Sequence, residues 1–341
     1  MGIGNAVMLE PLLRALRERF PDAHLAAAVR ADAASLSLIQ WPGLVDETVV
    51  VRGSSRLALM RAGLRLARGN WDLLVVRFNG AAYEIVTAAT FGRIPYRLGH
   101  VSSGRFRTNV DWLFNLPVTM SEYDHEVDRY IALAQPLGVN AKGWVPSLRL
   151  SSEDREGAKR ILRHLGVSEG SVVAIQPGTS KHQSWKRWPT EHWKSLACGL
   201  SRRGFTVVGL GSSDERELLA DICREPGTVN AAGLCSLREA AAILERCELL
   251  VCTDSGLMHI GAAVGTLIVG IFGPTDRTRT RPYGAGHTLL VPDKHCQGHG
   301  IPCLTIRGEL SPTCTWQRCL EGIRPEQVLS AVFRQCRVSA D

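Results

Sequence analysis

The chain has 341 residues, of which 45% are hydrophobic and 21% are charged, as is usual for a soluble globular protein, and its length favours two domains. It contains neither a run of about 18 apolar residues nor a signal-peptide pattern at its start, so we expect a cytoplasmic protein. The net charge of +7 fits a solvated basic surface as well as a nucleotide, glycolipid or membrane-surface ligand. No nucleic-acid recognition motif is present, and we expect no nucleic-acid partner.

The first twenty residues predict a glycine-rich turn followed by a helix. Met1–Asn5 forms the expected turn, and apolar residues recur at helical spacing through Ala6–Phe20. A strand is expected at His24–Val29. Because a glycine turn that opens a helix normally follows a strand, we expect the first strand of this domain to be missing or replaced by an unusual edge.

The rest of the first half alternates short apolar runs with helical periods. The expected strands are Thr48–Val51, Asp72–Arg77 and Tyr96–Leu98, and the expected helices are Ser55–Ala67, Ala82–Phe91 and a long helical segment from Asn109 to Gln135. Alternating strands and helices predict a parallel sheet with helices on both faces.

A second alternating series starts after a change of composition near Trp144. Ser151 to Asp154 read as the cap of a helix that runs to about Leu165, so we expect domains at 1–150 and 151–341. The expected strands of the second domain are Ser171–Gln176, Thr206–Leu210, the start of Glu248–Ala263, and Leu267–Phe272; the expected helices are Glu191–Arg202, Asp214–Arg224, Leu237–Glu245 and Pro325–Cys336. The fold class is therefore α/β, with two doubly wound domains.

Glu248–Ala263 is the segment that predicts a ligand site most directly. It reads as a buried strand, a tight Asp254-Ser255-Gly256 turn and the start of a helix. Such a turn directs backbone N–H groups and the positive end of a helix dipole beyond the strand, where open α/β sheets bind ligands. We therefore expect an anion there.

Two other strand ends in the second domain carry related signals. Gln176–Ser180 offers hydroxyl and N–H groups for phosphate oxygens, and Lys186 lies in a basic loop that could stabilise a diphosphate leaving group or simply face solvent. In Gly209–Glu215 the two glycines alone are a weak signal. Glu215 is either a first-turn carboxylate of a helix or an acceptor for a ribose hydroxyl.

Four of the ten cysteines gather in a loop rich in glycine and proline. Cys296, Cys303, Cys314 and Cys319 match no familiar zinc spacing. Stabilising thiols, a disulfide, a metal site and chance remain open for this cluster.

Together these motifs resemble glycosyltransferase family 9, which includes the ADP-heptose:lipopolysaccharide heptosyltransferases. The motifs that carry the resemblance are Gln176-Pro177-Gly178-Thr179, Lys186-Arg187-Trp188-Pro189, Asp254-Ser255-Gly256-x-Met258-His259, Phe272-Gly273-Pro274-Thr275-Asp276 and the opening segment from Gly2. The resemblance covers nearly the whole chain. It implies a GT-B fold, in which two Rossmann-like domains face a cleft, with the acceptor in 1–150 and the donor in 151–341.

The resemblance also implies a reaction and a set of site residues. The reaction is an inverting transfer of a heptose or related sugar that needs neither a metal nor a cofactor. The implied donor is a nucleotide-diphosphate sugar, ADP-heptose above all. The implied acceptor is a lipid-linked lipopolysaccharide core or another glycan at the inner membrane surface. The implied site residues are Gly4 and Asn5 in the opening loop, Thr179 and Ser180 at the phosphates, Lys186 as their counter-charge, Glu215 at the ribose, and Asp254, Ser255, Gly256, Leu257, Met258 and His259 around the sugar and diphosphate.

Asn5 departs from the family pattern, which has an aspartate proposed as the catalytic base at this position. An amide takes up no proton at neutral pH, so Asn5 cannot be that base. Glu10 and His259 are weak candidates to replace it. A catalytically impaired nucleotide-sugar-binding paralogue or assembly partner is therefore an alternative function, and a GT-B-like nucleotide-sugar epimerase is a further one.

Overall fold

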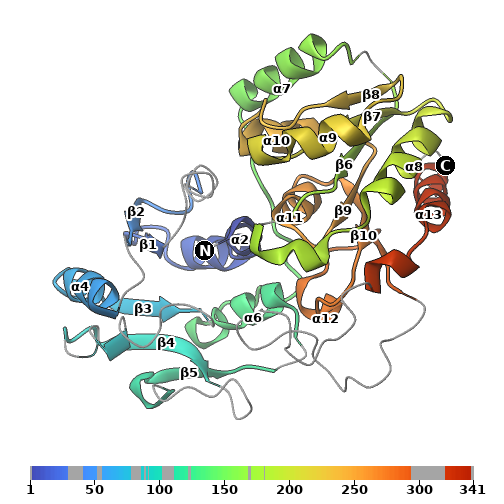
Figure 1. Cartoon of the computed structure of the whole chain (residues 1–341). Coiled ribbons are helices and arrows are strands. Elements are labelled where there is room, and N and C mark those ends of the chain that lie inside the picture. The colour runs from blue at the N-terminus through green and yellow to red at the C-terminus, as the bar shows by residue number, and fades with distance from the viewer. Residues whose placement is uncertain are drawn as a thin grey trace. The chain divides into compact units, whose positions relative to one another are not determined.

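A computed structural model of the chain divides into two compact units, Met1–Pro146 and Ser147–Asp341 (Figure 1). The structure describes residues 2–29, 41–51, 56–77, 86–87, 90, 92–101, 111–121, 124–167, 170–179, 181–292 and 319–338. Within these residues, no helix is both long enough and apolar enough to cross a membrane.

The described strands of the N-terminal unit form two parallel sheets. One pairs β1 (Ala26–Val29) with β2 (Glu47–Val50), and the other has the order β3 (Leu73–Val76), β4 (Tyr96–Val101), β5 (Leu116–Thr119). The α-helices described in full are α1 (Ile3–Met8), α2 (Glu10–Arg19), α4 (Arg56–Ala67) and α6 (Glu126–Ala132). Parallel strands joined through helices match the α/β class expected from the sequence.

Two predictions for the N-terminal unit were wrong. The expected turn Met1–Asn5 and helix Ala6–Phe20 are instead α1 and α2, which meet at Leu9, because Pro11 fits only the first turn of a new helix. The expected helical segment from Asn109 to Gln135 contains strand β5, and α6 starts only after His125, whose ring accepts from Val127 N (3.1 Å). Most of the expected helix Ala82–Phe91 lies outside the described residues.

The C-terminal unit contains a six-stranded parallel sheet in the described part of the chain. Its strand order is β11-β10-β9-β6-β7-β8, with the bounds β6 Val172–Gln176, β7 Thr206–Gly209, β8 Thr228–Asn230, β9 Leu249–Thr253, β10 Leu267–Ile271 and β11 Thr288–Leu290. The chain builds outward from β6 to one side through β8 and then returns to add β9 to β11 on the other. The doubly wound prediction is confirmed here, although the three-residue strands β8 and β11 were not foreseen.

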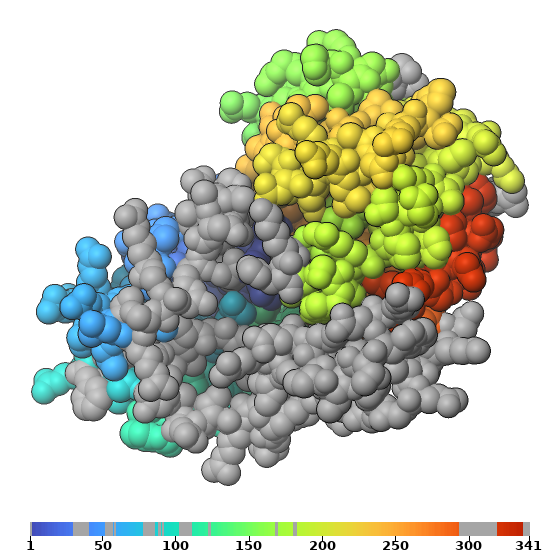
Figure 2. All heavy atoms as spheres, in the orientation of Figure 1, coloured from blue at the N-terminus to red at the C-terminus, as the bar shows by residue number. Residues whose placement is uncertain are grey.

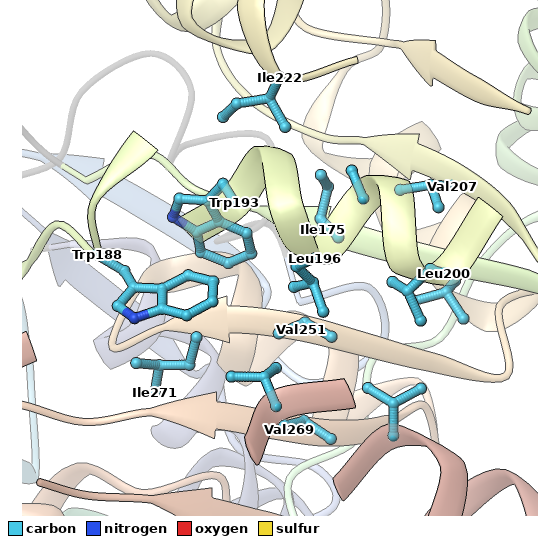
Figure 3. Close-up of a cluster of buried hydrophobic side chains, with 14 of the residues drawn as sticks. Ile175, Trp188, Trp193, Leu196, Leu200, Val207, Ile222, Val251, Val269 and Ile271 are labelled. Carbon is cyan, nitrogen blue, oxygen red and sulfur yellow. The ribbon is translucent and has the colours of Figure 1, made fainter. Parts of the chain in front are cut away.

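Helices cover both faces of this sheet. The α-helices described in this unit are α7 Ser152–His164, α8 Thr190–Ser201, α9 Arg216–Ile222, α10 Leu237–Glu245, α11 Gly256–Ala263, α12 Arg277–Thr280 and α13 Pro325–Val338. Side chains of α8, α9 and α13 share one core cluster with alternate residues of β6, β7, β9 and β10, and Figure 3 shows Trp193, Leu196 and Leu200 of α8 above these strands. In Figure 2 the same three helices lie at the surface of the unit.

Both sides of the central strands are buried. The alternate residues Ala174, Val208, Leu250 and Ile268, which point away from α8, are each 0% exposed. This double burial explains why these strands read as continuous apolar runs instead of alternating patterns.

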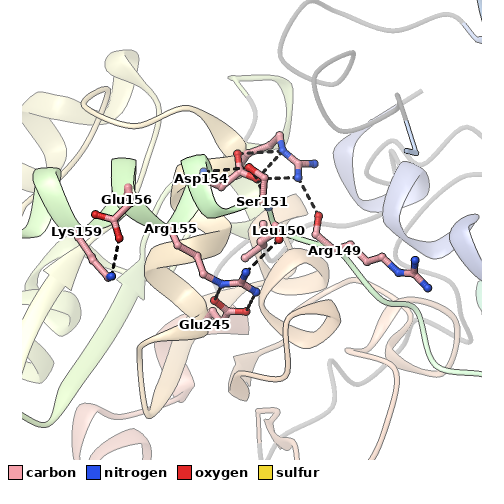
Figure 4. A network of polar contacts seen from close by, with 9 residues as sticks. Arg149, Leu150, Ser151, Asp154, Arg155, Glu156, Lys159 and Glu245 are labelled. Carbon is pink, nitrogen blue, oxygen red and sulfur yellow. Dashed lines mark hydrogen bonds and ion pairs between the residues drawn. The ribbon is translucent and has the colours of Figure 1, made fainter. Parts of the chain in front are cut away.

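An ion-pair network holds the first segment of this unit (Figure 4). Asp154 forms a capping box with Ser151 at the start of α7, where the sequence predicted a helix cap, and also accepts from Arg238 Nε and Nη2 (3.0 and 2.7 Å). Arg238 Nη2 donates in addition to the carbonyl of Arg149 (2.8 Å). The connection into α7 is thereby fastened to the first turn of α10.

We expect Arg238→Ala to lower the free energy of unfolding by about 1–2 kcal/mol. Although burial acts to raise the pKa of Asp154, hydrogen bonds from Arg238 and Ser151 bring it below its ordinary value. This stabilisation is therefore present above the ordinary aspartate pKa and is lost as the pH falls through the lowered value. In urea unfolding, the difference between wild type and variant should shrink from about pH 7 to about pH 3.

Arg155→Ala provides a matched control, because Arg155 pairs with Glu245 across the same two helices at a more exposed place. The side chains of that pair are 47% and 32% exposed, against 20% and 12% for Arg238 and Asp154. Arg155→Ala should therefore cost less stability than Arg238→Ala. Equal losses would contradict the special role given to Asp154.

Candidate functional site

The three loops singled out in the second domain follow three neighbouring strands. β6 lies between β9 and β7 at the centre of the sheet, and the registers pair Gln176 with Cys252 and Ile175 with Gly209. Since the strands are parallel, their carboxyl ends meet at one edge. The junction of β6 and β9 is also the point where the strand order reverses, which is where doubly wound sheets bind ligands.

Lys186 and Asp254 form an ion pair across this junction. Lys186 Nζ lies 2.8 Å from Asp254 Oδ2, and the two side chains are only 12% and 9% exposed. The expected basic loop is a 3₁₀ turn, η3 (Lys181–Lys186). Two residues later, buried Trp188 donates from Nε1 to the carbonyl of Ile323 (2.9 Å), which anchors this end of the turn and so positions Lys186.

Thr179 links the loop after β6 to the same basic segment. Its hydroxyl donates to the carbonyl of Gln183 (3.1 Å) and accepts from Arg187 Nε (3.3 Å). Arg187 thus brings a second cation to the loop that was expected to hold phosphate. Ser180 lies outside the described residues.

Gln176 connects the two loops on either side of the junction. Its Nε2 donates to the carbonyl of Gly178 (2.5 Å), and its Oε1 accepts from the hydroxyl of Ser255 (2.6 Å). The Gln176 side chain is buried at the last position of β6. The sequence motif contained Gln176 without giving it a role; an amide at the end of an otherwise apolar buried strand was the available signal.

Glu215 takes the capping role that the sequence allowed. Its Oε2 accepts from the backbone N and the hydroxyl of Ser212 (2.7 and 3.0 Å) in a capping box at η4 (Ser213–Glu215). Its Oε1 lies over Gly178, where an added Cβ would overlap it. Gly178 thus leaves room for a carboxylate between the loops after β6 and β7, and contact with a ribose stays a prediction.

The predicted segment from Asp254 to His259 divides into half-buried and buried parts. Ser255 is the N-cap of α11, and Gly256 and Leu257, which start the helix, are half-buried. Met258 and His259 are buried at 0% and 6% exposure. The side chain of Met258 therefore belongs to the core, and its backbone N–H remains the part proposed to meet a ligand.

Gly4 and Asn5 lie in the N-terminal unit, within α1. Asn5 Oδ1 accepts from the hydroxyl of Tyr130 (3.3 Å), which itself accepts from Arg77 Nη1 (3.0 Å). Burial raises the pKa of Tyr130 to about 12, so this hydroxyl keeps its proton and donates. Glu10, the weak substitute base, is buried with its Oε1 3.4 Å from Arg14 Nε.

Of the four cysteines clustered in the glycine- and proline-rich loop, the structure describes Cys319. Cys296, Cys303 and Cys314 lie outside the described residues. Among the residues that are described, no group of three or more His, Cys, Asp or Glu side chains could hold a metal ion.

Comparisons of the sequence and of the structure with known proteins both find heptosyltransferases. Residues 71–300 match the family described as Glycosyltransferase family 9 (heptosyltransferase). Lipooligosaccharide heptosyltransferase 2 of Haemophilus influenzae is 29% identical over 65% of this chain and 66% of its own length, and lipopolysaccharide heptosyltransferase 2 of Salmonella typhimurium is 28% identical over 82% of each. The solved ADP-heptose lipopolysaccharide heptosyltransferase II of Escherichia coli superimposes with a TM-score of 0.73 at 24% identity, covering 100% of this chain and 98% of that one. This likeness confirms the expected GT-B fold class.

Proposed function

Because the chain belongs to glycosyltransferase family 9, we propose that it transfers a heptose or related sugar from a nucleoside diphosphate to a lipopolysaccharide-core or similar glycan acceptor. The family membership confirms the resemblance carried by the motifs. The donor we propose is ADP-heptose, the donor for which the solved Escherichia coli heptosyltransferase II is named.

One observation supports this proposal above the others. The loops after β9, β6 and β7 follow neighbouring strands at one edge of the sheet, and Lys186 lies 2.8 Å from Asp254 across the junction of β6 and β9, where the strand order reverses. A helix N-terminus, an ammonium group and several short polar loops at one sheet edge suit a diphosphate. We assign the phosphates to Thr179, Lys186 and the first turn of α11, and the ribose to Glu215.

The proposed step is an attack by an acceptor hydroxyl on the anomeric carbon, from the face opposite the diphosphate, and the hydroxyl loses its proton to solvent water as the new carbon–oxygen bond forms. The bond between this carbon and the phosphate oxygen breaks, the configuration inverts, and negative charge grows on the departing nucleoside diphosphate. The Lys186 ammonium would leave its ion pair with Asp254 and pair with this phosphate. The backbone N–H groups of Gly256 and Leu257 would stabilise the same negative charge. These groups supply positive charge from the protein itself, and we propose a metal-independent reaction.

We place the acceptor in the N-terminal unit, at the segment with Gly4 and Asn5. Asn5 can orient an acceptor hydroxyl but cannot take its proton. A lipid-linked acceptor would bring a cytoplasmic enzyme to the inner membrane surface, and we propose such a peripheral contact.

Incubation of the full chain with ADP-heptose and a heptose-acceptor core oligosaccharide tests the proposal. We expect release of ADP together with a product heavier by one heptose, and no product when UDP-sugars replace the donor. Absence of both donor binding and release of the nucleoside diphosphate across a panel of nucleotide-sugars would rule out the proposed function. Product formed from the donor without any acceptor would instead indicate an epimerase.

A further inference from the structure

Ser255 occupies a capping position at α11 without capping the helix. Its backbone is extended (φ −146°, ψ 170°), as expected for an N-cap, yet its side chain accepts no hydrogen bond from the helix. Ser151 at α7 (φ −80°, ψ 167°) and Ser236 at α10 (φ −65°, ψ 166°) are also extended, with a similar ψ and a less negative φ, and their hydroxyls accept from Asp154 N and Glu239 N. The same residue type at the same kind of position thus behaves differently at the candidate donor site.

Gln176 gives the Ser255 hydroxyl a partner outside its own helix. The carbonyl of Gly178 needs a donor, so it fixes the amide of Gln176 with Nε2 toward Gly178 and Oε1 toward Ser255. The single hydrogen of the Ser255 hydroxyl is then donated to Oε1 at 2.6 Å. The hydroxyl is held toward β6 and away from the first turn of its own helix.

The first turn of α11 also lacks the other half of a capping box. Asp154 and Glu239 stand at the third helical position of α7 and α10, whereas Met258 holds that position in α11, and the first turn of α11 has no acidic residue. Neither an N-cap hydroxyl nor an acidic side chain at the third position therefore occupies the backbone N–H groups at the start of α11. They remain at the positive end of the helix dipole, where an anion is favoured.

We propose that Gln176 is a positioning residue for the donor diphosphate: it holds the Ser255 hydroxyl away from the N-terminus of α11 and so keeps the backbone N–H groups there open to phosphate. This inference rests on the proposed function. Without Gln176, the hydroxyl of Ser255 rotates onto the first turn as it does at Ser151 and Ser236, and the donor must then displace it. Gln176 need not touch the donor to affect its binding.

A double-mutant cycle tests this role through the dissociation constant of ADP, measured by calorimetry on the full chain. Gln176→Ala should raise this constant about fivefold, the factor that corresponds to one ordinary N-cap hydrogen bond. In a Ser255→Ala background the same Gln176→Ala change should have an effect below about twofold, because no hydroxyl is left to compete. Removal of both partners also leaves no unpaired buried amide oxygen.

Ser236→Ala is the matched control at α10. It removes a real N-cap and should lower the melting temperature while the dissociation constant of ADP stays unchanged. If Gln176→Ala raised the dissociation constant of ADP equally with and without the Ser255 hydroxyl, the proposal would be overturned. That result is expected if Gln176 only stabilises the loop after β6 or contacts the ligand directly. If the wild-type chain binds no ADP, the proposed function itself fails; if it binds ADP without the coupling, only the role of Gln176 fails.

Discussion

Lys186→Ala should reduce kcat/KM for the donor about 100-fold and raise the dissociation constant of ADP about tenfold. The variant removes the ammonium group proposed to neutralise the leaving diphosphate, and the loss in rate exceeds the loss in binding because the phosphate charge grows in the transition state. Steady-state kinetics with ADP-heptose and calorimetry with ADP measure the two effects. Unchanged kinetics would contradict the role given to Lys186.

The same substitution should also destabilise the ligand-free protein. Asp254 is 9% exposed and pairs with Lys186 at 2.8 Å, so removal of the ammonium leaves a buried carboxylate without its counter-charge. We expect a loss of about 2–3 kcal/mol in the free energy of unfolding. A fixed concentration of ADP should stabilise the variant less than the wild type, because the variant binds ADP more weakly.

Asp254→Asn separates the two effects of Lys186. In the double variant Lys186→Ala/Asp254→Asn the buried charge is absent, and the free energy of unfolding should return to within about 1 kcal/mol of wild type. The affinity for ADP should stay low, because the ammonium is still missing. A double variant that regains both stability and affinity would show that Lys186 serves only to neutralise Asp254.

The sequence was sufficient to place the candidate ligand loops at strand ends but not to pair their residues. Strand, turn and helix signals placed Gln176–Ser180, Gly209–Glu215 and Glu248–Ala263 at strand ends, because apolar runs and glycines are local signals. The contacts from Lys186 to Asp254 and from Gln176 to Ser255 join residues 68 and 79 positions apart. Such pairs depend on strand order, which periodicity does not specify.

The N-terminal unit shows where local signals fail. Pro11 was read as part of one long helix, although proline is best tolerated in a first turn, and it marks the start of α2. Strand β5 was missed because four residues between helix-compatible segments carry little periodic signal. The contact of Asn5 with Tyr130 spans 125 positions, so only the folded chain brings them together.

Asn5→Asp should raise kcat about 100-fold, within the range contributed by a general base. Asn5 Oδ1 already accepts from the Tyr130 hydroxyl at 3.3 Å, and one carboxylate oxygen can keep that contact. The second oxygen replaces an amide nitrogen that carries two hydrogens, and it can accept the proton of an acceptor hydroxyl. The rate of the variant should fall at low pH, as the carboxylate becomes protonated near its ordinary pKa of about 4.

Tyr130→Phe in the Asn5→Asp background tests whether this hydrogen bond orients the new carboxylate. We expect it to remove part of the gain in kcat with little effect on the dissociation constant of ADP, because Tyr130 and the donor loops belong to different units. Asn5→Ala controls for loss of the side chain itself. A transfer rate in Asn5→Asp no higher than in wild type would show that another group deprotonates the acceptor; Asn5 would then act by orienting the acceptor hydroxyl, and Asn5→Ala should raise the KM for the acceptor.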